Sequence, residues 1–224
     1  MIKWRLQWAS LYLWLLSLAI FMTIILAWGI YPLEIRWQAL EKTVYLSGRT
    51  IAYNFNRLMA YLTLPWVTTF DLPAFSSSAS GRHHFLVVKW LFHLVEALVF
   101  LLAYPACRFL GQVMKHRALA LFKRPLVLAI TLPIVLAIGA VLIGFDQFFT
   151  LFHQLLFVGD DSWLFDPLKD PVILILPEDY FLHAFVLFFG LYESLFLCLY
   201  VIALCQNGHR DDTKAPKMTK YEKR

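Results

Sequence analysis

The chain has 224 residues, of which 60% are hydrophobic and only 16% are charged, and its formal net charge is +5 at pH 7. Its mean hydropathy of +0.64 is far above that of soluble globular domains. The composition therefore excludes an ordinary soluble domain and predicts an integral membrane protein.

Four apolar stretches are long enough to cross a bilayer, which takes about 20 residues of helix. We expect transmembrane spans at approximately residues 6–31, 85–110, 126–145 and 180–205, packed as one all-α membrane bundle in a single domain, residues 1–224. The first stretch follows basic residues as a signal sequence would, but it is too long for a signal h-region and lacks a small-residue cleavage site. We therefore expect it to be a retained anchor.

Basic residues gather at the N-terminus, in the 108–124 loop and in the tail from residue 210, which together hold 13 of the 20 Lys and Arg residues. By the positive-inside rule, both termini and the tail at 206–224 are predicted to be cytoplasmic. The segments 32–84 and 150–179 then form an extracytoplasmic cap. Contact with membrane lipids, and no binding to nucleic acid, is the expected role of the positive charge.

The first outer segment is predicted to contain one amphipathic helix, which Ser47 can cap. Its apolar residues recur at helical spacing: Ile51, Phe55, Leu58, Met59 and Leu62. We expect this helix to lie against the bundle or the lipid surface. Pro65, Pro73 and a serine run should then end regular structure until His84, where the second span begins.

Ionisable residues lie inside the second and fourth spans. Lys89, His93 and Glu96 follow one another at helical spacing, and Glu193 lies deep in the fourth span. Such residues are costly in a bilayer unless they are paired or face a polar cavity, so each indicates a functional site by default. Contacts of His93 with Lys89 and with Glu96 would instead satisfy these groups without any chemistry.

The helical pattern of the third span can continue past its apolar core through Asp146, Phe149 and His153. This spacing puts Asp146 and His153 on one face, two turns apart. Farther along, Val172 to Leu176 is a short apolar run between two prolines, which predicts one strand. The expected fold is therefore a four-helix membrane bundle with a small mixed α/β cap.

Two histidines at the predicted outer membrane edge are candidates for proton transfer, because imidazole titrates near neutrality and can both take and give a proton. His153 ends an apolar run, and spacing alone also permits a structural interfacial role. Asp146 could orient its ring. His84, beside His83, lies at the same predicted depth, so the two rings could divide base and acid roles. Aromatic residues that could surround such a site are Phe148, Phe149, Phe152, Phe157, Trp163, Phe165, Trp66 and Phe70.

Several enzyme signatures do not occur in the sequence. It contains no G-x-S-x-G, no H-E-x-x-H, no paired cysteine motif and no glycine-rich phosphate loop. A covalent serine mechanism and a zinc hydrolase therefore have no support, and neither a metal nor a cofactor is expected.

A series of aromatic, acidic and proline residues extends over 37 residues around His153. It runs Phe145 Asp146, Phe149 Thr150, Phe152 His153, Phe157, Trp163, Asp166 Pro167, Asp170, Pro177 Glu178 and Phe181. This series resembles the signature of the bacterial lipoprotein intramolecular transacylases. Asn54 to Leu62 is similar to a second family segment, with Phe55 in place of a tyrosine. His84 to Lys89 resembles a His x x Asp Val Lys motif, with Val87 in place of the aspartate.

The resemblance implies a four-span protein of the bacterial cytoplasmic membrane with its active site at the extracytoplasmic face. It also implies an acyltransferase acting on diacylglyceryl-modified bacterial lipoproteins. The enzyme would move the sn-2 acyl chain of the modified cysteine to that cysteine's own α-amine, without a covalent acyl-enzyme. His153 and His84 would be catalytic. Supporting or substrate-binding roles would fall to Asp146, Phe152, Phe157, Trp163, Asp166, Asp170, Glu178, Asn54, Arg57, Tyr61 and Lys89.

Within this set, Arg57 or Lys89 could stabilise the oxyanion, whereas Asp166 and Asp170 are better suited to fixing the loop by Asx-type turns. Two other classes of protein remain open. One is a haem-binding four-helix electron carrier with ligands among His84, His93, His153 and His183. The other is a non-enzymatic membrane adaptor whose cap binds a partner. No oligomeric state is predicted.

Overall fold

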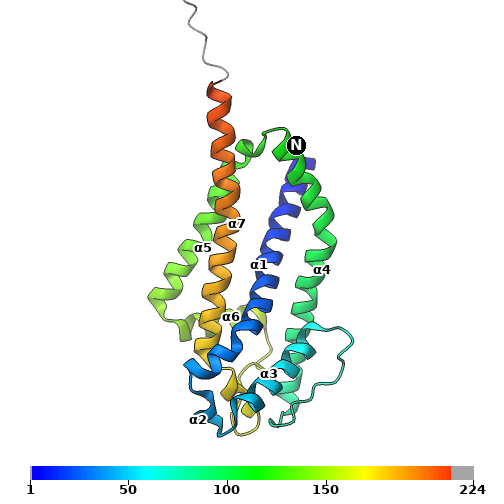
Figure 1. Ribbon diagram of the computed structural model, residues 1–224, viewed down its shortest axis with the longest axis vertical. Helices are drawn as coiled ribbons and strands as arrows, with labels where there is room; N and C mark the ends of the chain where they lie inside the picture. The colour runs from blue at the N-terminus through cyan, green and yellow to red at the C-terminus, as the bar shows by residue number, and fades with distance from the viewer. Residues whose placement is uncertain (1, 213–224) are drawn as a thin grey trace, which may run out of the picture.

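Four long helices run alongside one another through the computed structural model (Figure 1). The structure describes the backbone of residues 2–212 and the side-chain environments of residues 4–206, so most of the predicted cytoplasmic tail at 206–224 lies outside the described residues. The helices in chain order are α1 (Ile2–Trp37), α2 (Leu40–Val44), α3 (Gly48–Thr63), α4 (Ala79–Lys115), η1 (Leu119–Phe122), α5 (Lys123–Ile143), α6 (Phe145–Leu156), η2 (Pro171–Ile175) and α7 (Glu178–Asp212).

As predicted, four helical segments are long and apolar enough to cross a membrane, namely α1, α4, η1 with α5, and α7. α1 packs against both α4 and α7, while α5 packs on the other side of α7. The short helices α2, α3 and α6 gather at the end of the bundle opposite the N-terminus (Figure 1). We call this end the cap, formed by residues 38–78 and 144–177.

The predicted α/β character of the cap is wrong. The part of the chain that the structure describes contains no strand, and Pro171–Ile175, within the expected strand region, forms the 3₁₀ helix η2. Val172 and Ile175 are fully buried there, and the Ile175 carbonyl accepts a 2.6 Å hydrogen bond from the Tyr31 hydroxyl of α1. The apolar run Val172 to Leu176 is therefore explained by burial against the bundle and not by pairing in a sheet.

Ser47 caps α3 as predicted, because its hydroxyl oxygen accepts a hydrogen bond from the Thr50 backbone N–H at 3.2 Å. The five apolar residues that suggested this helix are all buried. Phe55 stacks on Tyr31 of α1, with ring planes 9° apart. The apolar face of α3 therefore lies against the bundle and not against lipid.

Two boundaries differ from the expected ones, and both determine where the candidate histidines lie. α4 begins at Ala79, inside the serine-rich stretch that was expected to be irregular. The third membrane helix does not continue through Asp146, because α5 ends at Ile143 and Gly144 has a φ of +86°. A residue with this positive φ cannot extend a right-handed α-helix, so α6 starts anew at Phe145 with its own direction.

Candidate active site

His84 and His153 come together between the start of α4 and the end of α6. Their ring centroids are 6.2 Å apart, and the ring planes are inclined by 32°. His84 lies in the second turn of α4, whereas His153 lies in the last turn of α6. Two residues 69 positions apart in the sequence thus lie close together, which their shared predicted depth permits.

An aromatic shell holds the His153 ring. Trp163 stacks on it with centroids 4.9 Å apart, and Phe149 lies 4.2 Å away at a steeper angle. Phe157 stacks on it at 5.7 Å, and Phe152 meets its edge at 5.6 Å. The predicted shielding residues Phe152, Phe157 and Trp163 therefore all contact the ring.

The orientation of His153 fixes which nitrogen can act as a base. Nδ1 lies 2.8 Å from the Phe149 carbonyl oxygen, which can only accept, so Nδ1 donates. In the neutral ring, Nε2 then carries the lone pair. Burial lowers the pKa of His153 below its ordinary value, although the bond to the Phe149 carbonyl opposes this shift. The lowered pKa favours the neutral ring, and the bond to the Phe149 carbonyl selects the tautomer with the proton on Nδ1.

His84 is more deeply buried, with only 6% of its surface exposed. Phe157 lies 4.8 Å from its ring, and Phe165 meets it edge-on at 5.3 Å. Phe157 thus contacts both histidines. The Nδ1 atom of His84 is buried without a hydrogen-bond partner among the described residues, so no protein group there fixes its tautomer.

The neighbouring His83 points to a different partner. Its Nε2 lies 3.0 Å from Oδ2 of Asp160, while Oδ1 of Asp160 accepts a hydrogen bond from the Ser162 backbone N–H. Hydrogen bonding to Ser162 lowers the pKa of Asp160. This interaction joins the loop after α6 to the first turns of α4, next to the two candidate histidines.

Asp170 fixes the start of α4, and with it the position of His84. Its carboxylate accepts hydrogen bonds from the backbone N–H and the hydroxyl of Ser78, both at 2.7 Å. Ser78 in turn caps α4 by accepting from the Gly81 backbone N–H. A Cβ atom at Gly81 would collide with the Asp170 carboxylate, so glycine makes room for this contact.

α6 is held by aromatic contacts with α7. Phe185 of α7 packs against Phe145, Phe148 and Phe152, with centroid distances of 5.0 to 5.8 Å. One turn nearer the cap, Phe181 packs against Phe149 at 5.2 Å. No α6 residue is fully buried, so these ring contacts determine where the helix places His153.

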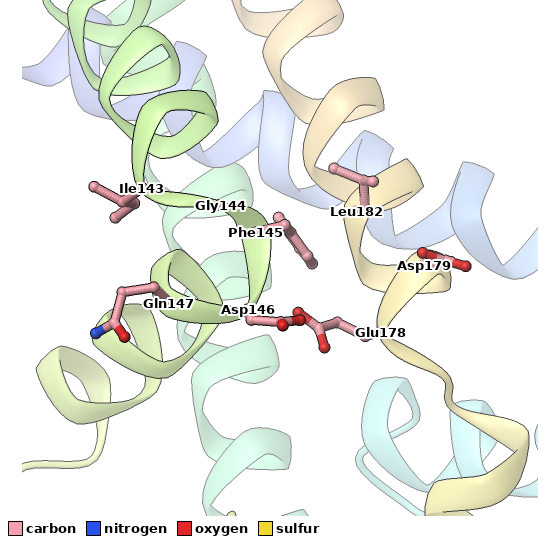
Figure 2. A pocket seen from close by; sticks show the side chains of 8 residues that line it. All are labelled: Ile143, Gly144, Phe145, Asp146, Gln147, Glu178, Asp179 and Leu182. Carbon is pink, nitrogen blue, oxygen red and sulfur yellow. The ribbon is translucent and has the colours of Figure 1, made fainter.

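Asp146 does not orient His153 as the helical spacing suggested, because the Phe149 carbonyl binds His153 Nδ1 instead. The carboxyl groups of Asp146 and Glu178 lie next to one another in the lining of a cavity of about 340 Å³ (Figure 2). Gln147, Asp179 and Leu182 also line this cavity. Two of the four acidic residues in the predicted set thus line a separate polar pocket at the start of α6 and α7.

The two cations that were proposed to stabilise the oxyanion, Arg57 and Lys89, bind other groups in the structure. Arg57 forms a 2.7 Å ion pair with Asp71 at the surface and also donates to the Asp71 carbonyl. Lys89 Nζ donates to the Val67 carbonyl at 2.5 Å and lies 4.4 Å from the centre of the Tyr61 ring. Both cations therefore hold the connection between α3 and α4.

The remaining predicted supporting residues organise the cap. Asn54 is buried and binds the backbone of Thr50 and Ala74. Asp166 accepts a hydrogen bond from the Leu168 N–H and so forms an Asx-type turn. Among the other aromatic candidates, Phe165 contacts His84, and Phe70 packs between Tyr61 and Phe85. Trp66 is exposed.

Inside the spans, His93 Nδ1 lies 2.8 Å from Glu96, so the expected contact between these two is confirmed. The expected contact of His93 with Lys89 is replaced by the Lys89 bond to Val67. Both carboxyl oxygens of Glu193 are buried without a partner among the described residues. His183 binds the fully buried Glu34 of α1 at 2.9 Å.

Three residues that support the site, Ser78, Gly81 and Asp160, were not predicted, although the sequence contains local signals for them. Ser78 is followed three residues later by Gly81. A serine at this position can cap a helix, and the glycine leaves room for another side chain to approach the helix start. Asp160 precedes Ser162 by two residues, the spacing of an Asx-type turn. Each could be recognised only after the loop from 157 to 170 was placed against α4.

A model of the family described as lipoprotein intramolecular transacylase Lit matches residues 5–181. A search of curated proteins finds no match. Among solved structures, the membrane integral lipoprotein intramolecular transacylase Lit from Bacillus cereus is similar, with a TM-score of 0.80 and 26% identity over 91% of this chain and 94% of that chain.

Two variants of the same Bacillus cereus protein, each with one histidine replaced, have the same fold. The histidine-to-arginine variant has a TM-score of 0.73 and 24% identity, with 94% of each chain covered. The histidine-to-alanine variant has a TM-score of 0.73 and 26% identity, with 91% of each chain covered. The bundle and its cap are thus shared over nearly the whole length of both chains.

Proposed function

The chain belongs to the lipoprotein intramolecular transacylase family, and from this membership we propose that it converts diacylglyceryl lipoproteins to the lyso form by histidine acid–base catalysis. The α-amine of the modified cysteine attacks the sn-2 ester carbonyl, and a tetrahedral intermediate forms. The bond from that carbon to the glyceryl oxygen then breaks as the amide is completed. One proton passes, in net terms, from the amine nitrogen to the glyceryl oxygen.

The meeting of His84 and His153 is the single observation that carries this proposal. Their rings face one another across 6.2 Å from separate helices, inside an aromatic shell. Two proton-transfer groups at this separation can reach the same ester and amine placed beside the pair of rings. Because the substrate supplies its own nucleophile, the reaction requires no acyl-enzyme.

His153 is the base in this proposal. Its Nδ1 is bound to the Phe149 carbonyl, so the lone pair on Nε2 is available to take the amine proton. The α-amino group has an unperturbed pKa of about 7.7 to 8.0, within reach of an imidazole base. The lowered pKa of His153 keeps the ring neutral at the pH where the amine begins to deprotonate.

His84 serves the oxygen side of the reaction. Its Nδ1 has no protein partner among the described residues, so its ring can adopt the tautomer that donates to the developing oxyanion or the glyceryl oxygen. Arg57 and Lys89 are already bound to Asp71 and Val67. A histidine donor is therefore better supported for this role than either cation.

Positioning is expected to supply much of the catalysis, because both reacting groups belong to one flexible substrate. Holding them in a near-attack geometry is worth up to about 7 to 11 kcal/mol. Phe157 contacts the His84 ring and Trp163 stacks on the His153 ring. These rings would confine the diacylglyceryl group while excluding water from the reacting ester.

The same proposal places the cap outside the cell and both termini in the cytoplasm. The basic connection between α4 and α5 lies at the end of the bundle opposite the cap (Figure 1). By the positive-inside rule that end faces the cytoplasm. A membrane-impermeant reagent directed at a cysteine introduced into the 157–170 loop, applied to intact cells, tests this orientation.

The function itself is tested with the purified protein and a synthetic diacylglyceryl lipopeptide. Mass spectrometry should locate the transferred chain on the α-amine. His153→Ala should abolish conversion while the protein remains folded, whereas His93→Ala, at the His93–Glu96 pair inside α4, should retain it. Full turnover by His153→Ala contradicts the base assignment, and near-normal turnover by His84→Gln would make His84 a structural residue.

A further inference from the structure

The His84 ring is enclosed by protein. Only 6% of the residue is exposed, and its Nδ1 atom is buried without a hydrogen-bond partner among the described residues. A group that transfers a proton must come within hydrogen-bond reach of the substrate, which is about 2.6–3.2 Å between heavy atoms. A lipid ester cannot approach an enclosed ring to this distance. The arrangement is therefore a closed one, and access to His84 requires that a covering segment move.

One segment, residues 159–168, places an aromatic ring against each candidate histidine, and we call this segment the lid. Its Trp163 stacks on the His153 ring with centroids 4.9 Å apart. Its Phe165 meets the His84 ring edge-on at 5.3 Å. Movement of the lid away from the bundle would therefore uncover both imidazoles at once.

The lid is attached to the rest of the protein by few interactions. Within the described residues, its backbone hydrogen bonds are all local, such as those from the Asp160 N–H to the Phe157 carbonyl and from the Leu164 N–H to the Asp161 carbonyl. Ser162 is the only lid residue that is buried. Segments with local hydrogen bonds and few buried side chains are the ones that open most easily. The lid can therefore move without breaking a helix of the bundle.

Among the described residues, a single polar interaction ties the lid to a helix of the bundle. His83 Nε2 of α4 lies 3.0 Å from Oδ2 of Asp160, and the two side chains are 57% and 29% exposed. Exposed pairs of this kind are weak and easily broken. Before Asp160, Gly159 has a φ of +76° and open space around it, which suits a hinge. After the lid, the bond of Asp170 to Ser78 fixes the other end.

We propose that the lid opens to admit the lipid ester and closes over it, with the His83–Asp160 pair as its latch. The inference rests on the proposed function, because a reaction at both imidazoles requires the lid to leave them. On opening, Trp163 and Phe165 move away from the histidines. Phe157 stays, because its N–H donates to a backbone carbonyl of α6 at 2.8 Å. Closure then excludes water from the reacting ester, so the lid moves in every turnover.

A reversible cross-link tests whether the lid must open. In the full-length protein, serine first replaces the three native cysteines, Cys107, Cys198 and Cys205. A short bis-thiosulfonate reagent then joins His83→Cys to Asp160→Cys. Turnover of the diacylglyceryl lipopeptide should fall at least about tenfold and return when the link is reduced. The matched control link joins Asp161→Cys to Leu164→Cys within the lid, where the two backbones are already hydrogen-bonded, and should leave turnover unchanged.

The chemical reactivity of His84 measures opening without turnover. Diethyl pyrocarbonate carbethoxylates accessible imidazoles, and mass spectrometry of peptides locates the product. In the locked protein, His84 should react at least about tenfold more slowly than after reduction of the link. His183, whose side chain is 43% exposed, should react equally in both. Without any link, His83→Ala should speed the reaction of His84, whereas Leu86→Ala, at a 42% exposed position of α4, should not.

Slow turnover and slow modification of His84 in the locked protein, both reversed by reduction, support the lid. Normal turnover in the locked protein overturns it, as does a loss of turnover with unchanged His84 reactivity or an equal loss with the control link. Unchanged His84 reactivity in His83→Ala also overturns it. Lid-dependent reactivity of His84 in an unaltered protein that transfers no acyl chain would support the lid and contradict the proposed function.

Discussion

The carboxylate of Asp170 accepts two hydrogen bonds from Ser78, one from the backbone N–H and one from the hydroxyl, each 2.7 Å long. Ser78 caps α4, which carries His84, whereas Asp170 ends the loop that carries Trp163 and Phe165. Those two rings contact His153 and His84 respectively. One pair of residues therefore joins the supports of both histidines.

Replacing Asp170 by alanine should destabilise the protein and disorder the site. The carboxylate is only 4% exposed, and its loss leaves the Ser78 donors unsatisfied at a cost of about 1–3 kcal/mol. Turnover should fall roughly tenfold to a hundredfold because His84 loses its fixed position. Thermal unfolding in detergent and the lipopeptide assay measure the two effects. Asp161→Ala, at an exposed position in the same loop, is the control, and identical behaviour of both variants would disprove the role.

The pH dependence of kcat/KM should reflect the lowered pKa of His153. A base must be neutral, so the rate should fall as the pH decreases through that pKa, which lies below the ordinary value of about 6.5. Removing the stacked ring in Trp163→Ala exposes the imidazole to water and should move this acid limb toward 6.5. Trp66→Ala, at an exposed cap position, should leave the limb in place. An acid limb at the same pH in all three proteins would exclude His153 as the titrating base.

Arg57→Ala should retain normal turnover. Its ion pair with Asp71 is partly exposed, and such pairs contribute about 0 to 1 kcal/mol to stability. Loss of a donor to an oxyanion, in contrast, costs roughly a hundredfold to a thousandfold in kcat. Steady-state kinetics on the lipopeptide distinguish these cases. A decrease of the larger size would show that Arg57 leaves Asp71 to bind the substrate.

The membrane helices were predictable because they depend on local patterns, whereas the pairing of His84 with His153 was suggested by their shared predicted depth and by the family resemblance. Long apolar stretches predict membrane helices whatever packs around them, and the α3 face was visible in its helical spacing. The strand expected at Val172 to Leu176 was wrong for a related reason. A five-residue apolar run indicates burial, but its conformation depends on the neighbouring segment, which here is α1.

The partners of the charged residues could not be predicted from spacing. Asp146 was assigned to His153 because the two share a helical face, yet its carboxyl group lies next to that of Glu178, at the start of α7 (Figure 2). Lys89 was paired with His93 on the same helix, but it binds the Val67 carbonyl in the preceding loop. Contacts between distant segments compete with those along one helix, and the sequence contains no measure of which is closer.

Gly144 provides the last prediction, because it separates α6 from α5 and sets the direction in which His153 is presented. Its φ of +86° is a conformation that an L-residue adopts only with strain, so Gly144→Ala should destabilise the protein and lower turnover. Gly139→Ala is the matched control, since Gly139 lies within α5 at an ordinary φ with open space around its Cα. Alanine there should be neutral or stabilising by about 0.5–1 kcal/mol.

Thermal unfolding and turnover of the two variants should therefore change in opposite directions or by clearly different amounts. Equal effects would mean that a continuous α5–α6 helix is tolerated and that the break does not position His153.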